Sequence, residues 1–220
     1  DDDILVLANN DTIFMPGSLS SLVDALERHP EAGMVGPRLL WPDGSLQPSM
    51  RDFPFPGKLI REHLPYLGRK AAVYSSHLIE QKVDWLVGAV MAFRREALLD
   101  TGPFDEDYFF YHEETDLQYR MIRSGWEVWF IPEASVIHLE GVAARQMFGR
   151  ETWLRYIPEK IRFLRKHGKY GAVTGFRVFM TLLYTFRLFA GLVKPGRRKH
   201  DIRYTASYCW KAIGLTWKHN

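Results

Sequence analysis

The order of apolar runs and amphipathic stretches limits the folds open to this chain more than any other feature. Residues 4–8 (Ile-Leu-Val-Leu-Ala) form an unbroken apolar run, typical of a strand buried on both faces of a parallel sheet. An amphipathic helix over about residues 19–28 and a short strand at 33–36 follow. Further strands are predicted at 83–93, 128–131 and 134–137. This alternation predicts an α/β sheet with flanking helices.

Composition excludes several classes of protein. The chain has 220 residues and is 46% hydrophobic, which is too apolar for a disordered segment and sufficient for one domain with an appendage. A single cysteine, Cys209, excludes a disulfide framework and a cysteine-based zinc site.

Charge is divided unevenly along the chain. Residues 1–150 contain 14 Lys and Arg against 23 Asp and Glu, a net charge of −9, whereas residues 151–220 contain 15 against 3, a net charge of +12. With the motifs described below, this division predicts an acidic domain over residues 1–148 and a basic helical extension over residues 149–220.

The extension contains an apolar helical stretch over residues 170–193. At 100° per residue, one face is polar and basic, and the other is leucine and phenylalanine. The polar face holds Arg177, Thr181, Thr185 and Arg187, and the apolar face holds Phe179, Leu182, Leu183, Phe186 and Phe189. The uncharged stretch 178–186 is shorter than the ~20 residues of a spanning helix, which favours a position in the interface of an anionic membrane. A helical pair that packs its apolar face on the domain is the alternative.

Polar groups that suit metal and acid–base chemistry follow strands or begin a helix. Asn9-Asn10-Asp11 follows the first strand, Glu113-Glu114 begins a helix predicted over 113–123, and His138 follows the last strand. Ligands of open α/β sheets bind at the carboxyl ends of strands. Oxygen donors with one imidazole suit Mg²⁺ or Mn²⁺, and a separate carboxylate can act as a general base. Together they fit displacement of a diphosphate leaving group.

Each group also has a purely structural interpretation. Asn9-Asn10-Asp11 fits a turn, Glu113 and Glu114 fit the acidic first turn of a helix, and His138 fits a hydrogen-bonded structural histidine. The residues alone leave both interpretations open.

Three segments, in this order, resemble family 2 glycosyltransferases, and the rhamnosyltransferase-type bacterial members most. They are ILVLANNDTIFMPGSL, VDWLVGAVMAFRREALLDTGPFDEDYFFYHEETDLQYRMIRSGW and EVWFIPEASVIHLEG. The resemblance covers roughly residues 1–145. It implies a GT-A fold with a Rossmann-like, mostly parallel mixed sheet, a UDP-, dTDP- or GDP-sugar donor, and inversion at the anomeric carbon. It also implies that the family's N-terminal nucleotide-binding portion precedes residue 1.

The resemblance assigns the donor and metal side of the site. Asn9, Asn10 and Asp11 stand at the family's DxD-type motif, which binds the donor diphosphate. Asp11 and His138 match its metal ligands. Asn9 is a departure, because a neutral amide replaces the first acid of that motif.

The resemblance also assigns the acceptor side. Glu113 and Glu114 stand at the family's "ED" motif, whose second acid, here Glu114, deprotonates the acceptor hydroxyl. Glutamate replaces the more frequent aspartate there. Trp85, Gly88 and Ala89 match the segment that lines the acceptor. The Gln-x-x-Arg-Trp motif of processive synthases is missing, which favours transfer of a single sugar.

The sequence therefore predicts a metal-dependent inverting glycosyltransferase of cell-envelope polysaccharide synthesis. Its acceptor would be a glycan or a lipid-linked glycan, and its location would be cytoplasmic and peripheral at the inner face of the cell membrane. A membrane-tethered, non-catalytic binding module and a metal-dependent phosphoesterase are the alternatives. Nucleic acid is not an expected partner, because the basic residues alternate with leucine and phenylalanine.

Overall fold

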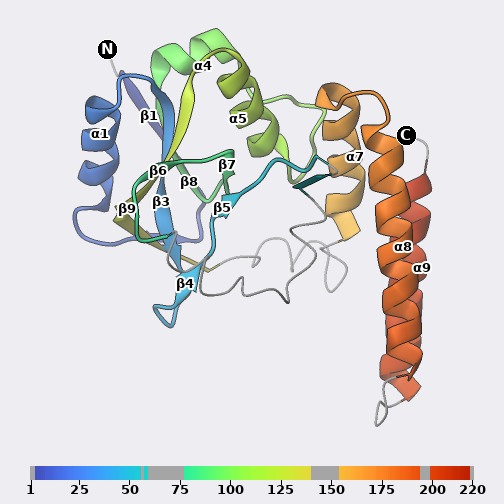
Figure 1. Cartoon of the computed structure of the whole chain (residues 1–220). Helices are drawn as coiled ribbons and strands as arrows, with labels where there is room; N and C mark the ends of the chain where they lie inside the picture. The colour runs from blue at the N-terminus through green and yellow to red at the C-terminus, as the bar shows by residue number, and fades with distance from the viewer. Residues whose placement is uncertain (1–2, 56, 59–76, 140–153, 194–198, 219–220) are drawn as a thin grey trace. The chain divides into compact units, whose positions relative to one another are not determined.

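The computed structural model describes residues 3–55, 57–58, 77–139, 154–193 and 199–218 (Figure 1). Residues 50–80, rich in proline and glycine and without a clear period, are expected to form a long, partly helical surface loop, and most of them lie outside the described residues. The strands are β1 (Ile4–Ala8), β2 (Thr12–Phe14), β3 (Ala32–Leu40), β4 (Leu46–Gln47), β5 (Met50–Arg51), β6 (Gln81–Lys82), β7 (Trp85–Leu86), β8 (Val90–Arg94) and β9 (Glu127–His138). The helices are α1 (Ser18–Arg28), α4 (Arg95–Thr101), α5 (Glu113–Arg123), α7 (Tyr156–His167), α8 (Ala172–Val193) and α9 (Lys199–Trp217).

The main sheet has the strand order β1-β8-β3-β9-β2, with β4 paired to β3 and β6 to β9. The expected mixed α/β sheet is confirmed, but the expectation of mostly parallel pairing is wrong for the described strands. Only β3 and β9 pair in parallel among them; the other pairs of this sheet are antiparallel. Parallel neighbours need a long crossover, which α4 and α5 supply between β3 and β9, whereas a short turn joins β3 to β4.

The first strand differs from its prediction. β1 lies at the end of the main sheet and pairs with β8. Leu5, Val6 and Leu7 are 42%, 37% and 43% exposed, so the strand is not buried on both faces. An apolar run specifies burial only where other layers cover both faces, and no described element covers this strand to that extent.

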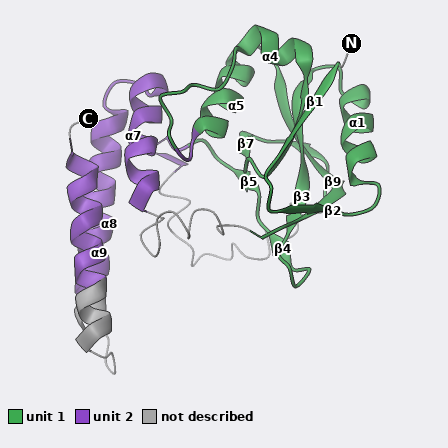
Figure 2. Cartoon of the chain, turned by 180° about the vertical axis from the view of Figure 1, so that it is seen from behind, with its two compact units in different colours: residues 1–53, 64–109, 113–142 green, residues 54–63, 110–112, 143–220 purple. Residues whose placement is uncertain are grey.

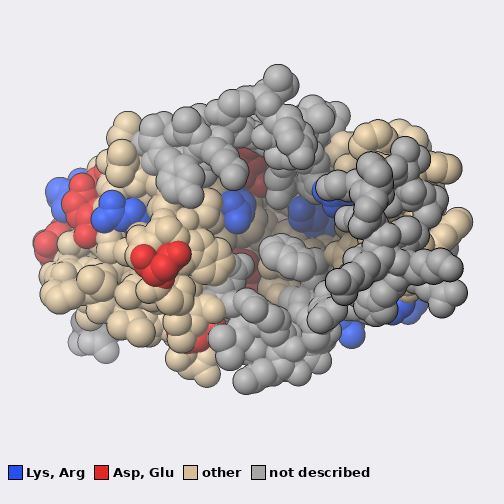
Figure 3. All heavy atoms as spheres, turned by 90° about the horizontal axis from the view of Figure 1, so that it is seen from below, with Lys and Arg blue, Asp and Glu red and all other residues tan. Residues whose placement is uncertain are grey.

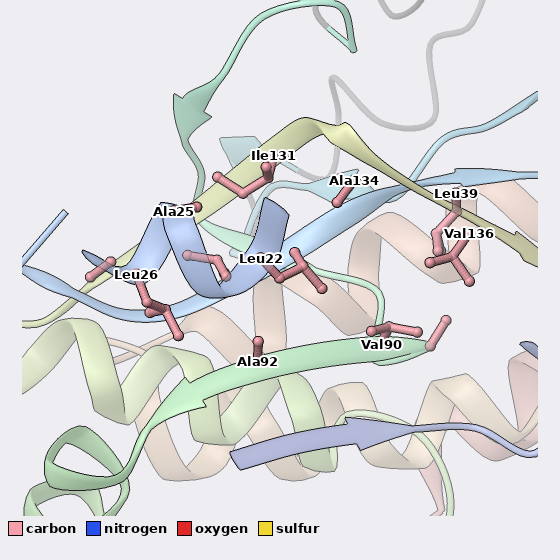
Figure 4. Close-up of a cluster of buried hydrophobic side chains, with 12 residues drawn as sticks. Leu22, Ala25, Leu26, Leu39, Val90, Ala92, Ile131, Ala134 and Val136 are labelled. Atoms are coloured by element: carbon pink, nitrogen blue, oxygen red, sulfur yellow. The ribbon is translucent and has the colours of Figure 1, made fainter. Parts of the chain in front are cut away.

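Helices cover both faces of the sheet. On one face, Leu22, Ala25 and Leu26 of α1 pack against side chains of β3, β8 and β9 (Figure 4). On the other face, Leu117 and Met121 of α5 pack in a second cluster of buried side chains from α4 and the same strands. The apolar positions of these helices recur at helical spacing, so each helix buries one stripe on the sheet.

Two other predicted strands change in extent. The strands expected at 128–131 and 134–137 are one strand, β9. Its pairing with β3 continues past Pro132 because the register shifts there: Pro37 pairs with Ile131, and the next residue, Arg38, pairs with Ser135. The strand expected at 83–93 is instead two strands, β7 and β8, separated by residues 87–89. β7 pairs with β5 in a separate two-stranded sheet.

The chain divides into two compact units (Figure 2). Unit 1 holds the sheets with α1, α4 and α5, over residues 1–53, 64–109 and 113–142. Unit 2 comprises residues 54–63, 110–112 and 143–220, and contains α7, α8 and α9. On the face of the molecule seen in Figure 3, acidic and basic side chains are interspersed with uncharged atoms.

Candidate active site

The loop after β1 lies beside the loop between β7 and β8. The backbone N–H of Asn9 donates to the carbonyl of Ala89 at 2.9 Å. The hydroxyl of Thr12 donates to the carbonyl of Asn9 at 2.7 Å, which closes the turn, and the side chains of Asn9 and Asn10 are exposed. The structure therefore brings the predicted donor-side residues next to the predicted acceptor-side segment.

The two predicted metal ligands lie together. The ladder between β2 and β9 pairs Thr12 with His138, and the N–H of Leu139 donates to the carbonyl of Asp11 at 3.0 Å. These backbone bonds place Oδ1 of Asp11 3.5 Å from Nε2 of His138. Both side chains are largely buried, at 17% and 6% exposed.

Gln47 on β4 orients the imidazole, and sequence reasoning missed it. Its Oε1 lies 3.0 Å from Nδ1 of His138, and its side chain is buried. When Nδ1 donates its proton to this oxygen, the lone pair of Nε2 is directed to the side of Asp11, as in a metal-binding histidine. Oxygen and imidazole donors suit Mg²⁺ or Mn²⁺, so Asp11 and His138 fit the expected metal. Among the described residues, no group of three or more His, Cys, Asp or Glu lies around one point.

Glu114 lies directly against Gly88. A β-carbon added at Gly88 would be 3.0 Å from Cγ and 3.1 Å from Cβ of Glu114, closer than side chains normally pack. Glu113 and Glu114 occupy the first turn of α5, where the helix dipole favours negative charge. The candidate base, on α5, therefore packs against the loop that also contacts Asn9.

A fully buried amide, Gln118, fixes the start of α5 against β7. Its Oε1 accepts from the N–H of Leu86 at 2.7 Å, and its Nε2 donates to the carbonyls of Leu86 at 2.8 Å and of Glu114 at 3.1 Å. In the sequence, Gln118-Tyr119-Arg120 does not reproduce the Gln-x-x-Arg-Trp motif of processive synthases, so Gln118 had no predicted role. A polar residue on the buried face of a helix was the available signal.

Asp116 holds the aromatic segment that precedes α5. This carboxylate is fully buried, and Nε of Arg120 donates to it at 2.7 Å. The same guanidinium donates to the carbonyls of Thr101 at 2.6 Å and Pro103 at 2.8 Å, and Tyr108 donates its hydroxyl to the carboxylate at 3.4 Å. The ion pair thus ties α5 to the end of α4.

The two residues before α5 adopt a backbone conformation that L-residues seldom take. Tyr111 and His112 have φ angles of +74° and +69°. Within unit 2, Tyr111 stacks on Tyr156 of α7, with ring centroids 3.8 Å apart, and the buried His112 lies near Tyr156 and Phe163. Burial, aided by the charge of Lys160, holds the pKa of His112 well below its usual value, so the imidazole is neutral.

Trp85 occupies a different position from its neighbours in the acceptor-side motif. It is buried on β7, and its indole N–H donates to the carbonyl of Asp52 at 2.9 Å. These contacts join it to the β5–β7 sheet, whereas Gly88 and Ala89 contact Glu114 and Asn9.

A solved structure shares this arrangement of strands and helices. The structure, titled "Crystal structure of GalNAc-T7 with UDP, GalNAc and Mn2+", contains a chain that is 12% identical, with a TM-score of 0.51 over 97% of this chain and 39% of that one. At this identity the likeness bears on the fold alone, and it confirms the GT-A class of α/β fold.

The glycosyltransferase-like family 2 model matches residues 1–163, and the chain therefore belongs to this family. It is 38% identical over 147 residues to the N-acetylglucosaminyl-diphospho-decaprenol L-rhamnosyltransferase of Mycobacterium tuberculosis, covering 62% of this chain and 47% of the relative. It is 25% identical over 118 residues to the rhamnosyltransferase WbbL of Escherichia coli K12, covering 51% and 45%. The chain thus spans about half the length of these relatives. The rhamnosyltransferase-like resemblance is confirmed.

Proposed function

We propose that the intact protein transfers an L-rhamnosyl group from a nucleoside-diphosphate donor to a hydroxyl of a lipid-linked glycan, with inversion. The observation that carries this proposal is the joining of three predicted site segments in unit 1. Asp11 lies beside His138, Asn9 bonds to Ala89, and Glu114 packs on Gly88. The names of the relatives support the sugar and the diphosphate-linked acceptor.

Asp11 and His138 would hold the divalent cation, Mg²⁺ or Mn²⁺. A bound cation offsets the negative charge that develops on a diphosphate leaving group. The residues contribute one carboxylate oxygen and one imidazole nitrogen, and Gln47 keeps the imidazole in the tautomer that can bind. Asn9 and Asn10 would contact the donor beside them through amide groups.

Glu114 would act as the general base. It takes the proton from the acceptor hydroxyl, the oxygen forms a bond to the anomeric carbon, and the bond from that carbon to the nucleoside diphosphate breaks on the opposite face. The configuration at that carbon is therefore inverted. Gln118 holds the backbone of Glu114, and Gly88 leaves room for its side chain. Glu113, next in the same helical turn, adds negative charge that favours proton acceptance by its neighbour.

The proposed division is a catalytic domain over 1–148 and a basic extension over 149–220 that keeps the protein at the inner face of the cell membrane. The net charge of +12 over residues 151–220 supports attraction to anionic lipid. A lipid-linked acceptor would place the hydroxyl at the same surface.

Titration of the intact protein with UDP-, dTDP- and GDP-linked sugars, each with and without Mn²⁺, tests the proposal. We expect binding of at least one donor that weakens when Mn²⁺ is removed and when Asp11 is changed to Asn. Absence of binding at millimolar donor would favour the alternative, a membrane-tethered module without catalytic activity.

A further inference from the structure

One face of α8 is both apolar and exposed. Val178, Leu182, Phe186 and Phe189 are 46%, 65%, 71% and 61% exposed. Their spacing of four, four and three residues places them on one stripe of the helix. Here they are called the α8 stripe. A soluble helix normally turns such a stripe toward a core, so its exposure needs a partner.

The opposite face of α8 packs within unit 2. Phe176, Met180 and Tyr184 are buried at a spacing of four residues, and α8 runs beside α9 in both ribbon views (Figures 1 and 2). On α9 the buried residues Cys209 and Ala212 are small, which lets the two helices approach closely. The core contacts of α8 are thus satisfied without the α8 stripe.

Part of the polar side of α8 contacts α9. The indole N–H of Trp217 donates to the hydroxyl of Thr181 at 2.8 Å, and the guanidinium carbon of Arg177 lies 5.5 Å from the centre of the Trp217 ring. The sequence predicted a polar face opposite an apolar face, and in the structure contacts with α9 occupy part of the polar face. The side of the helix that carries the α8 stripe is left to valine, leucine and phenylalanine.

We infer that the α8 stripe is the lipid-contacting face of the protein, lying in the interface of an anionic bilayer with the helix along the surface. The inference rests on the proposed peripheral location and names the residues responsible for it. By length and composition, Ala172–Ala190 would also suffice to cross a membrane. A surface position is favoured because only one side of α8 is apolar and exposed, while α9 packs on the other.

Charge favours lipid over a second copy of the chain as the partner. A symmetric dimer through α8 would bring together two segments of net charge +12, whereas an anionic bilayer provides the opposite charge. Arg187 is exposed on α8 itself, and Lys194, Arg197, Arg198 and Lys199 follow the helix in the sequence.

Two tryptophans on α9 are also partly exposed. Trp210 and Trp217 are 65% and 45% exposed, and their separation of seven residues places them on one helix face. Tryptophan, with an apolar ring and a polar N–H, is enriched at the boundary between membrane and water. Trp217 contacts Arg177 and Thr181, the chain neighbours of two stripe residues.

Co-sedimentation of the full chain with phosphatidylcholine vesicles, with and without phosphatidylglycerol, tests the inference. We expect the wild type to pellet with the anionic vesicles, and the double variant Leu182→Ser, Phe186→Ser to bind at least about tenfold more weakly, because two apolar side chains no longer enter the interface. Leu99→Ser on α4, where Leu99 is 73% exposed, is the matched control and should bind like the wild type.

Three outcomes would overturn the inference. They are a wild type that is not retained by anionic vesicles, a double variant that binds as tightly as the wild type, and a wild-type dimer in sedimentation that is lost in the double variant. Circular dichroism of each variant checks that the helices remain. Donor titration of the double variant separates this inference from the proposed function, because Leu182 and Phe186 lie in unit 2 and their substitution should leave sugar-nucleotide binding unchanged.

Discussion

Gly88 and Glu114 are in such close contact that the absence of a side chain at Gly88 determines where Glu114 can lie. A β-carbon at Gly88 would approach Cγ of Glu114 to 3.0 Å. We therefore expect Gly88→Ala to displace the carboxylate and lower kcat by about 10²-fold, since small misplacements of a catalytic group are costly. Steady-state kinetics should show the loss in kcat with little change in the donor KM. An unchanged kcat would mean that Glu114 is not held in its working position by this contact.

Gln47 should matter for metal affinity rather than for folding of the sheet. Gln47→Leu removes the partner of His138 Nδ1, and loss of such a partner typically weakens metal binding 10- to 100-fold. We expect the Mn²⁺ concentration for half-maximal donor binding to rise by at least about tenfold. Gln47→Glu, which can still accept the proton, should restore much of the affinity. Equal Mn²⁺ dependence in wild type and Gln47→Leu would argue against His138 as a ligand.

The buried ion pair of Asp116 and Arg120 should dominate the stability of this region. Asp116→Ala leaves the guanidinium without its carboxylate, which we expect to lower the free energy of unfolding by about 3 kcal/mol. Thermal unfolding measures the effect. The comparison is Glu127→Ala, which breaks the more exposed pair with Lys82 and should cost under about 1 kcal/mol. Similar losses in the two variants would show that the buried pair stabilises the fold no more than the exposed one.

Stability should fall on mild acidification because of His112. Its pKa is lowered by burial and by Lys160, so below about pH 6.5 the unfolded chain binds a proton that the folded chain does not. The stability that His112 contributes as a neutral imidazole is fully present above that pH and is lost as the pH falls. His112→Asn tolerates the positive φ and removes the proton-binding group, so its urea midpoint should change less between pH 7 and pH 5.

Glu80 affects stability at a lower pH than His112 does, so the effects of these two groups on stability can be separated. Burial raises its pKa, but hydrogen bonds from His29 and Arg28 outweigh that effect and hold the pKa below its ordinary value of 4.5. Its stabilising contribution is present above that value and is lost as the pH falls through the lowered pKa. A wild-type stability that is flat between pH 7 and pH 5 would contradict the prediction for His112.

Local sequence signals predicted the helices well. Acidic residues at the start and a glycine beyond the end predicted a helix over 113–123, and α5 has those bounds. The stripe of leucines and valine over 19–28 predicted α1 to within a residue. These elements follow from residues close in the chain, which is why the sequence alone was enough.

Strand environment was harder to predict because it depends on distant segments. Residues 4–8 are apolar, yet β1 lies at the end of the main sheet with three large apolar side chains exposed. Pro132 predicted a break, but the parallel pairing of β3 with β9 accommodates it in a register shift. Neither outcome follows from local composition.

In the candidate site, too, residues with a local sequence signal were predicted and residues that act through contacts with distant segments were not. Asp11 and His138 stood out by residue type and by following strands, and the ladder between β2 and β9 brings them together. Gln47 and Gln118 carry no motif and contact the site from segments distant in the chain or from the buried side of a helix. Only the structure identifies them as the groups that orient His138 and the turn containing Glu114.

The most direct test compares wild type, Glu114→Gln and Glu113→Gln in one transfer assay. Nucleoside-diphosphate-L-rhamnose is the donor, with its dTDP, UDP and GDP forms used in turn, and N-acetylglucosaminyl-diphospho-polyprenol is the acceptor. We expect transfer by the wild type and a loss of at least about 10³-fold for Glu114→Gln, with donor binding largely intact and a smaller loss for Glu113→Gln. Transfer by Glu114→Gln at nearly the wild-type rate would show that Glu114 is not the base.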